Sequence, residues 1–229
     1  MKKENPMSKR MKVVLSITAI VILVITGMLV WFVTRYHRTS SKRMVDKYEG
    51  TIEAVKSTVD QDGDGIDDQT DILESGLEYI DTQPKYKSAY YAGGYSNDEY
   101  GVCTDVVANA LLGAGYDLYE LVSKDIEENP EDYPINVPDP NIDFRRVKNL
   151  KVYFDHTAIS LTLDPRDIDE WQGGDIVVFE RHIGLVSDRR NKDGVCYVIH
   201  HANPYQTRYE QDVLENFGQK IIGHYRISE

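Results

Sequence analysis

A run of 21 uncharged, largely apolar residues near the N-terminus constrains this chain more than any other feature of its sequence. The run extends over residues 13–33 and reads VVLSITAIVILVITGMLVWFV. Because an α-helix rises about 1.5 Å per residue, a run of this length crosses the roughly 30 Å hydrocarbon core of a bilayer. It is longer than the apolar region of a typical signal peptide, and no A-x-A-like cleavage site directly follows it. We therefore predict one uncleaved transmembrane helix, with a cleaved signal peptide as the alternative.

Charge is distributed unevenly around this run. The first 43 residues contain nine basic residues and one acidic residue, a net charge of +8. Because the net charge of the whole chain is −12, residues 44–229 carry a net charge of −20. The basic flank over residues 1–12 slightly exceeds the flank after the run, which places the N-terminus in the cytoplasm. We expect a single-pass protein of the cell membrane whose C-terminal domain is extracytoplasmic. Such an acidic domain repels phosphate backbones, and we expect no nucleic-acid partner.

A stalk is predicted directly after the membrane helix. Met44, Tyr48, Ile52 and Val55 recur at intervals of three or four residues. This spacing is typical of an amphipathic helix, so we predict that residues 34–58 form a stalk helix.

The rest of the chain divides into a short acidic unit over residues 59–82 and a larger domain over residues 83–229. The larger domain begins with helical patterns and ends with β-runs such as GDIVVFE and HIGLVSD, which are separated by turns. Helices followed by an antiparallel sheet indicate an α+β fold.

The acidic unit contains DQDGDGIDDQTD, which fits a twelve-residue calcium loop. Carboxylates occupy positions 1, 3 and 5, a glycine takes the sharp turn at position 6, and predicted helices flank the loop as in an EF-hand. An aspartate closes the loop where many such loops have a bidentate glutamate, and a solvated Asp/Gly turn is the alternative. We expect a structural calcium ion. The predicted ligands are Asp60, Asp62, Asp64, the backbone carbonyl of Ile66, Asp68 and Asp71.

One cysteine lies where a loop becomes a helix, in the stretch EYGVCTDVVANALLGAG. The unpaired N–H groups at a helix N-terminus stabilise a thiolate, which favours Cys103 as a nucleophile. His182 begins one β-run and His200 ends the next, so an antiparallel pair of strands brings them together. His201 faces the opposite side of its strand and is the weaker candidate. A buried core thiol and a disulfide with Cys196 remain the alternatives for Cys103.

The motifs YYAGG, GVCTDVV, WQGGDIVVF, HIGLVSD and VIH follow one another as in NlpC-type cell-wall peptidases, which are papain-like enzymes. More closely, GVCTDVV, PNIDFRRVKNL, GDIVVFERHIGLVSD and GHYR resemble the YijF-like family, a domain of unknown function placed in that superfamily. The resemblance runs from about Gln83 to the C-terminus. It implies a papain-like core with Cys103 as nucleophile, His182 as base and His200 as the third polar residue. It also implies that Tyr90 lies near the nucleophile and assists the oxyanion site.

The residues beside the cysteine depart from the peptidase pattern. Val102 stands where those peptidases have Asp, and Thr104 and Asp105 replace their Ser-Gly pair. The peptidases' bond specificity therefore cannot be transferred. Arg145 and Arg146 are equally consistent with a clamp for a substrate carboxylate and with internal salt bridges.

These observations predict a membrane-anchored cysteine amidase or peptidase that acts on amide bonds of cell-wall peptide, with peptidoglycan as its substrate. No catalytic cofactor is expected. The alternative is a calcium-stabilised surface binding domain that keeps a papain-like shell without turnover.

Overall fold

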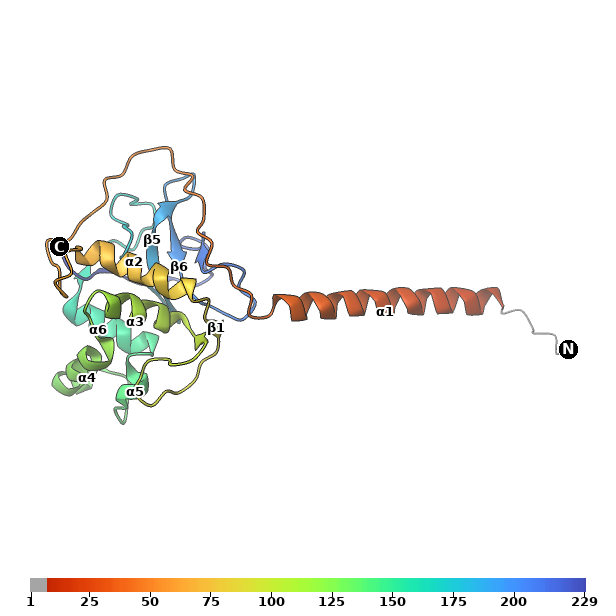
Figure 1. Ribbon diagram of the computed structural model, residues 1–229, viewed down its shortest axis with the longest axis horizontal. Helices are drawn as coiled ribbons and strands as arrows, with labels where there is room; N and C mark the ends of the chain where they lie inside the picture. The colour runs from red at the N-terminus through yellow and green to blue at the C-terminus, as the bar shows by residue number, and fades with distance from the viewer. Residues whose placement is uncertain (1–7) are drawn as a thin grey trace.

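Helix α1 (Lys9–Arg35) projects from one end of the remaining chain in the computed structural model, which describes residues 8–229 (Figure 1). The Ser8 side chain caps it by accepting the N–H of Met11 at 3.3 Å. Its side chains are exposed along its length, which confirms an apolar N-terminal helix that is long enough to cross a membrane. Its length and position fit a membrane anchor and a signal sequence alike. Residues 1–7 of the predicted basic flank lie outside the described residues.

The predicted stalk helix over residues 34–58 is wrong, because this segment has no helix after α1 and runs extended across the domain. Ser40 forms a β-bridge with Arg208, and the Lys47 N–H donates to the Arg190 carbonyl at 2.9 Å. The Arg43 guanidinium pairs at 2.9 Å with the buried carboxylate of Glu210. These bonds join the segment to residues far along the chain. Together they favour an extended backbone over the helix that the local apolar spacing predicts.

Five α-helices and a 3-10 turn follow the extended segment. Their bounds are α2 (Asp68–Asp81), α3 (Cys103–Gly113), α4 (Leu118–Glu128), the 3-10 turn (Pro130–Asp132), α5 (Pro140–Asp143) and α6 (Val147–Thr157). Helix α2 packs so closely across α3 that a Cβ on Gly76 would lie 3.3 Å from the Cβ of Ala110. Ile72 and Ile80 of α2 share a core with α3, so the fold has no boundary at residues 82 and 83.

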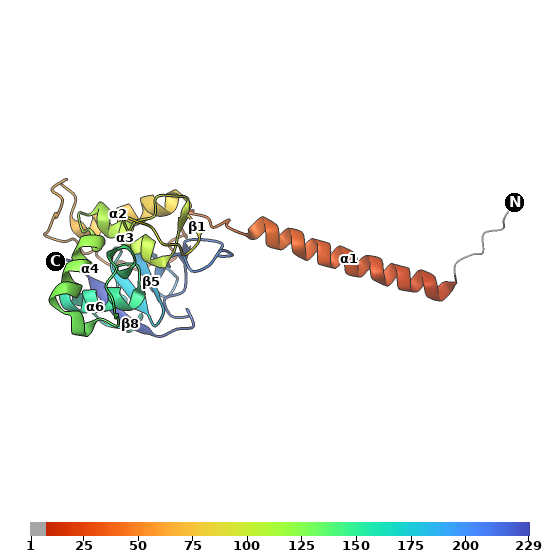
Figure 2. The ribbon, with the colours of Figure 1, turned by 90° about the horizontal axis from the view of Figure 1, so that it is seen from below.

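The antiparallel sheet confirms the predicted α+β class. Its six strands are ordered β3-β8-β4-β5-β6-β7, and a separate parallel pair is formed by β1 and β2. The strands are β1 (Lys85–Tyr86), β2 (Tyr100–Gly101), β3 (Ile159–Ser160), β4 (Ile176–Phe179), β5 (His182–Arg190), β6 (Cys196–Ile199), β7 (Glu210–Gln211) and β8 (Ile221–Arg226). Helices α2 and α3 cover one face of this sheet, as the two views show (Figure 2).

Each face of the sheet has its own apolar core. Ile183 and Leu185 of β5 join the core beneath the helices, whereas Val186 joins a smaller core with Trp171 on the other face. The two cysteines are free, and the two cores separate them, because Cys103 packs against the first core and the fully buried Cys196 belongs to the second. A disulfide between them would cross the sheet, so this alternative is removed.

Asp175 of the stretch GDIVVFE meets His224 and Arg226 of the motif GHYR in a buried network of polar and charged side chains. The Asp175 carboxylate accepts two bonds from the Arg226 guanidinium, both at 2.9 Å, and lies 3.0 Å from His224 Nε2. The His224 ring stacks on Trp171 with centroids 3.5 Å apart. Because unpaired buried charges are strongly destabilising, these residues hold β8 to the turn before β4 and serve the fold.

Candidate active site

Cys103 is the first residue of α3, directly after the N-cap Val102. The Asp105 carboxylate, at the third helical position, accepts the Val102 N–H at 2.8 Å. This bond satisfies one of the donors that a helix N-terminus leaves free and fixes the turn from which the cysteine projects. Because Val102 has no side-chain acceptor, Asp105 carries the capping alone.

Arg145 holds Asp105 from the other side. Its guanidinium forms a bidentate pair with the carboxylate, at 2.7 and 2.9 Å, and both side chains are about 2% exposed. The same guanidinium donates to the Ala89 carbonyl at 2.6 Å and lies over the Tyr91 ring. Of the two readings of Arg145, the internal salt bridge is the one observed, and it joins the cysteine turn to the loop before it.

Two histidines form a chain of hydrogen bonds at the ends of β5 and β6. His182 Nε2 lies 2.8 Å from His200 Nδ1, and His200 Nε2 lies 3.0 Å from Gln211 Oε1. With the amide oxygen facing the ring, His200 donates from Nε2 and accepts from the His182 Nε2–H. Nδ1 of His182 then carries the free lone pair that a general base requires.

The sulfur of Cys103 lies beside the start of β5. The backbone N–H groups of Ile183 and Thr104 lie near this sulfur, and both lower the pKa of the thiol. The His182 ring faces the other core, where it stacks on Phe217 with centroids 4.6 Å apart. Within residues 8–229, Cys103 therefore approaches β5 from the helix face, and its sulfur has no hydrogen bond to either imidazole.

Burial decides the charge state of this site. It raises the pKa of the Cys103 thiol to about 11, outweighing the neighbouring N–H groups. It also lowers the pKa of His182 to about 3, with the nearby His200 and His201 acting in the same direction. The resting site therefore holds a neutral thiol and neutral imidazoles, and the expected helix-stabilised thiolate is not formed.

Alkylation should report this directly. We expect iodoacetamide to label Cys103 of the folded protein at pH 7 about 100-fold more slowly than an unfolded cysteine peptide, because the thiolate fraction is that much smaller. The rate should still be rising at pH 10. Mass spectrometry of the labelled peptide measures it, and Cys103→Ala, which leaves only the buried Cys196, is the control. A rate that levels off near pH 8.5 would contradict the raised pKa.

The structure does not bring Tyr90 to the sulfur. Tyr90 is 58% exposed, and its hydroxyl bonds to Asp139 Oδ1 at 3.3 Å and Asn141 Nδ2 at 3.0 Å. The tyrosine beside the cysteine is Tyr86 in β1, whose pKa is raised by burial and by the Cys103 charge. No sequence motif indicated Tyr86.

His201 faces away from His200, as its place on the strand predicts. Its ring packs against Tyr86 and Tyr209, with centroids 5.2 and 5.1 Å apart. Both ring nitrogens are buried without a hydrogen-bond partner within the described part of the chain. His201 is thus a buried neutral imidazole on the same face of the sheet as Cys103.

The acidic loop brings three carboxylates together but lacks its first helix. Ligand atoms of Asp60, Asp62 and Asp64 lie within 4.8 Å of one another, and Gly65 adopts a φ of +96°. The segment before the loop is extended, so the EF-hand-like helix-loop-helix is wrong, and only α2 flanks the loop.

The remaining predicted ligands differ from these three. Asp68 is 2% exposed and accepts the Gln61 N–H and the Ser228 hydroxyl, both at 2.8 Å, so the structure uses it as an internal acceptor. The Asp71 carboxylate accepts the Ser75 hydroxyl at 3.0 Å. Burial and the charges of nearby Asp64 and Asp62 raise the pKa of Asp71, which places it close to the cluster. Ile66 is exposed at the turn.

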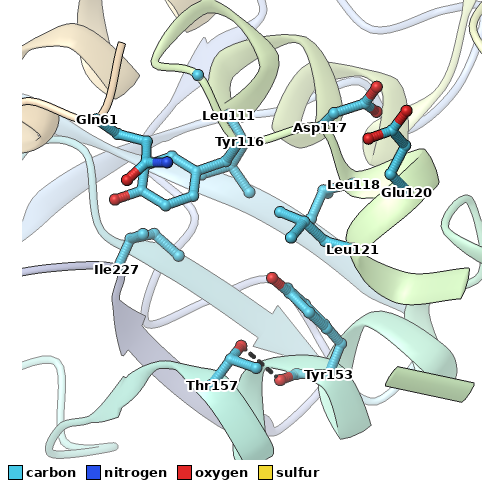
Figure 3. A pocket seen from close by; sticks show the side chains of 11 residues that line it. Gln61, Leu111, Tyr116, Asp117, Leu118, Glu120, Leu121, Tyr153, Thr157 and Ile227 are labelled. Atoms are coloured by element: carbon cyan, nitrogen blue, oxygen red, sulfur yellow. Dashed lines mark hydrogen bonds between the residues drawn. The ribbon is translucent and has the colours of Figure 1, made fainter. Parts of the chain in front are cut away.

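A cavity of about 300 Å³ lies at the other end of α3 (Figure 3). Leu118, Leu121 and Ile227 line it, and the Tyr153 side chain points into it. Leu111 of the lining lies eight residues, or about 12 Å, along α3 from the cysteine. The cavity is therefore separate from the cysteine corner and adjoins the acidic loop through Gln61.

These features define a class of protein: an α+β domain that follows an apolar N-terminal helix and holds a free cysteine near two hydrogen-bonded histidines. The chain belongs to the family described as "Domain of unknown function (DUF1287)", which matches residues 73–227. It is 39% identical over 153 residues to "Uncharacterized protein YijF" of Escherichia coli (strain K12), over 62% of this chain and 72% of that protein. This confirms the resemblance to the YijF-like family. No solved structure matches the chain. The acidic loop at residues 60–71 precedes the matched region.

Proposed function

We propose that this protein is a membrane-anchored, extracytoplasmic cysteine hydrolase that cleaves amide bonds of cell-wall peptide, with an NlpC-type, papain-like core. One observation carries the proposal. The hydrogen-bonded relay from Gln211 through His200 ends at His182, and the backbone N–H of the next residue, Ile183, lies at the Cys103 sulfur. A nucleophile, a base and an orienting group in this order are the elements of acyl transfer by cysteine.

The charge state suggests how the reaction proceeds. With both groups neutral at rest, the thiol loses its proton to His182 Nδ1 as the sulfur attacks the carbonyl carbon, a step that requires the His182 ring to turn from the second core toward the sulfur. Backbone N–H groups of Cys103 and Ile183 stabilise the oxyanion that develops. The imidazolium then protonates the leaving amine, and water attacks the thioester to release the acid and free the cysteine. His200 orients the His182 ring, and Gln211 fixes the tautomer of His200.

Digestion of purified peptidoglycan by the full-length protein in detergent tests the proposal, with mass spectrometry of the released fragments. We expect new amine and carboxyl termini at one type of amide bond, and none with Cys103→Ala. His201→Gln should retain cleavage, because this ring is absent from the relay. Intact peptidoglycan after prolonged incubation would overturn the proposal.

A calcium-stabilised binding domain without turnover is the second candidate. The observation that favours it is the separation of the sulfur from the imidazoles, because Cys103 and the His182 ring face different cores. Binding of peptidoglycan by wild type and Cys103→Ala alike, with no cleavage by either, distinguishes this candidate from the hydrolase.

We also propose that the loop over residues 60–71 binds a structural calcium ion. The converging carboxylates of Asp60, Asp62 and Asp64 are suitable ligands, and the charge of Asp71 lies near them, outside that group of three. The ion would relieve the repulsion among these charges. It would also stiffen the loop against the turn at Gly115, where an added Cβ would lie 3.0 Å from that of Asp62.

Calcium should therefore stabilise the domain. At a free concentration about 100 times the dissociation constant, we expect about 2.7 kcal/mol of added unfolding free energy. Urea denaturation with calcium and with a chelator measures the difference. Asp62→Ala should abolish it, whereas Glu131→Ala, at an exposed acidic residue of the 3-10 turn, should preserve it. Equal stability in calcium and chelator would rule the site out.

A further inference from the structure

We infer that the cysteine corner opens at the membrane surface and takes an amide substrate carried on a membrane lipid. The inference rests on the proposed function for its chemistry and on the contacts between α1 and the domain for its geometry. Figures 1 and 2 both show α1 leaving the domain at the end where β1 lies, with α4 at the remote end.

The loop that follows the two histidines contacts the end of α1. Tyr205 packs edge-on against Phe32 of the helix, with centroids 5.8 Å apart, and against Tyr36 at 5.5 Å. The His37 N–H donates to the Pro204 carbonyl at 2.8 Å. Tyrosine and tryptophan favour the headgroup level of a bilayer, and Tyr205 joins the Trp31 end of the helix in such a belt.

A second set of contacts joins the same end of α1 to the cysteine. His37 Nδ1 accepts the Tyr86 N–H at 3.0 Å, and Tyr86 is paired with Gly101 in the parallel strands β1 and β2. Cys103 is two residues beyond Gly101. With about 4.8 Å between strands and at most about 7 Å between residues i and i+2, the cysteine lies roughly 20 Å or less from His37, two residues beyond the end of α1.

The charges at this end suit an anionic headgroup. Arg35, Arg38 and Lys87 are exposed there, and Lys85 pairs with Glu99, the residue before β2. At this corner these four cations outnumber the exposed carboxylates of Asp98 and Glu99, in a domain that is otherwise strongly acidic. An acidic domain repels anionic lipid elsewhere, so this local excess of positive charge directs the cysteine corner toward the membrane.

A lipid-tethered probe tests the geometry without requiring catalysis. The full-length protein is reconstituted in phosphatidylcholine vesicles containing phosphatidylethanolamine with a headgroup maleimide on either a short linker or a long polyethylene glycol. Two exposed positions are compared in the Cys103→Ala background, Glu99→Cys beside the corner and Glu120→Cys on α4. Rates are normalised to soluble maleimide.

We expect Glu99→Cys to react with both linkers at similar normalised rates. Glu120→Cys should react at least about tenfold faster with the long linker, because the short one cannot span the domain. Equal dependence of the two positions on the long linker would overturn the inference.

The substrate arm compares a peptidoglycan stem peptide coupled to phosphatidylethanolamine with the same peptide free in solution. We expect the vesicle-bound protein to cleave the lipid-linked peptide at least about tenfold faster. Two results overturn the inference and leave the proposed function standing. One is cleavage of the two peptides at equal rates; the other is labelling of Glu99→Cys that requires the long linker, together with cleavage of the free peptide. Short-linker labelling of Glu99→Cys without cleavage of either peptide overturns the proposed function and, with it, the lipid-carried substrate.

Discussion

Arg145→Met is expected to lower the free energy of unfolding by about 3–5 kcal/mol, because it leaves a buried carboxylate without its partner. Asp105 and Arg145 are each about 2% exposed and bind each other through two hydrogen bonds. Losing the guanidinium also frees the Ala89 carbonyl. Urea denaturation followed by tryptophan fluorescence measures the change.

The neighbouring arginine provides a matched control. Arg146 is 49% exposed and lies 3.4 Å from Asp143, so Arg146→Met should change stability by no more than about 1 kcal/mol. Adding Asp105→Asn to Arg145→Met removes the stranded charge and should recover part of the loss. If Arg145→Met and Arg146→Met cost the same, Arg145 does not organise the cysteine turn.

Stability is expected to fall steeply as the pH drops from about 6.5 to 4. Burial lowers the pKa of His200 and His201 to about 4, and that of His182 to about 3. The unfolded chain binds protons on these residues near pH 6.5, whereas the folded chain does not. Because the unfolded state then holds more protons, the unfolding free energy decreases with falling pH.

The expected loss is about 4 kcal/mol per pH unit when three histidines are involved, and about 5–10 kcal/mol in total. The pKa of Asp71 is raised, so this one carboxyl group opposes the loss of stability at low pH. Urea denaturation at pH 7, 6 and 5 measures the slope. His201→Phe should reduce it by about a third without loss of stability at pH 7, because both ring nitrogens are unpartnered. A stability that stays constant between pH 6.5 and 5 would contradict the buried neutral histidines.

Local patterns predicted the parts of the fold that local forces determine. The apolar run forms α1, and the β-runs around His182 form the hairpin of β4 and β5. The stalk helix failed because its apolar spacing competes with distant partners: Arg43 binds Glu210, 167 residues along the chain. Single-sequence periodicity contains no information about such a partner.

The same division applies to the candidate site. Cys103, His182 and His200 were indicated by a helix start and by strand ends. The structure places Cys103 and the two imidazoles near the start of β5, but on opposite faces of the sheet. Gln211 was missed because β7 pairs with β6 across a loop of ten residues, from His200 to Tyr209, which carries no turn motif that fixes the register.

The charge state of the site also depended on burial. Position at a helix N-terminus favours a thiolate, but the surrounding core determines that the thiol of Cys103 stays neutral. Asn141, to which the sequence assigned no role, holds the loop before the cysteine, since its side chain accepts the Gly93 N–H at 2.7 Å. In each case the decisive contact comes from a residue far along the chain.

The central claim is that Cys103 forms a thioester with a cell-wall peptide, and intact-protein mass spectrometry tests it most directly. The full-length protein is mixed with soluble peptidoglycan fragments and quenched in acid after short intervals. The account predicts an added acyl mass on the peptide that contains Cys103, formed much more slowly in His182→Ala and absent in Cys103→Ala. Cleavage of the fragments by Cys103→Ala at the wild-type rate would contradict it.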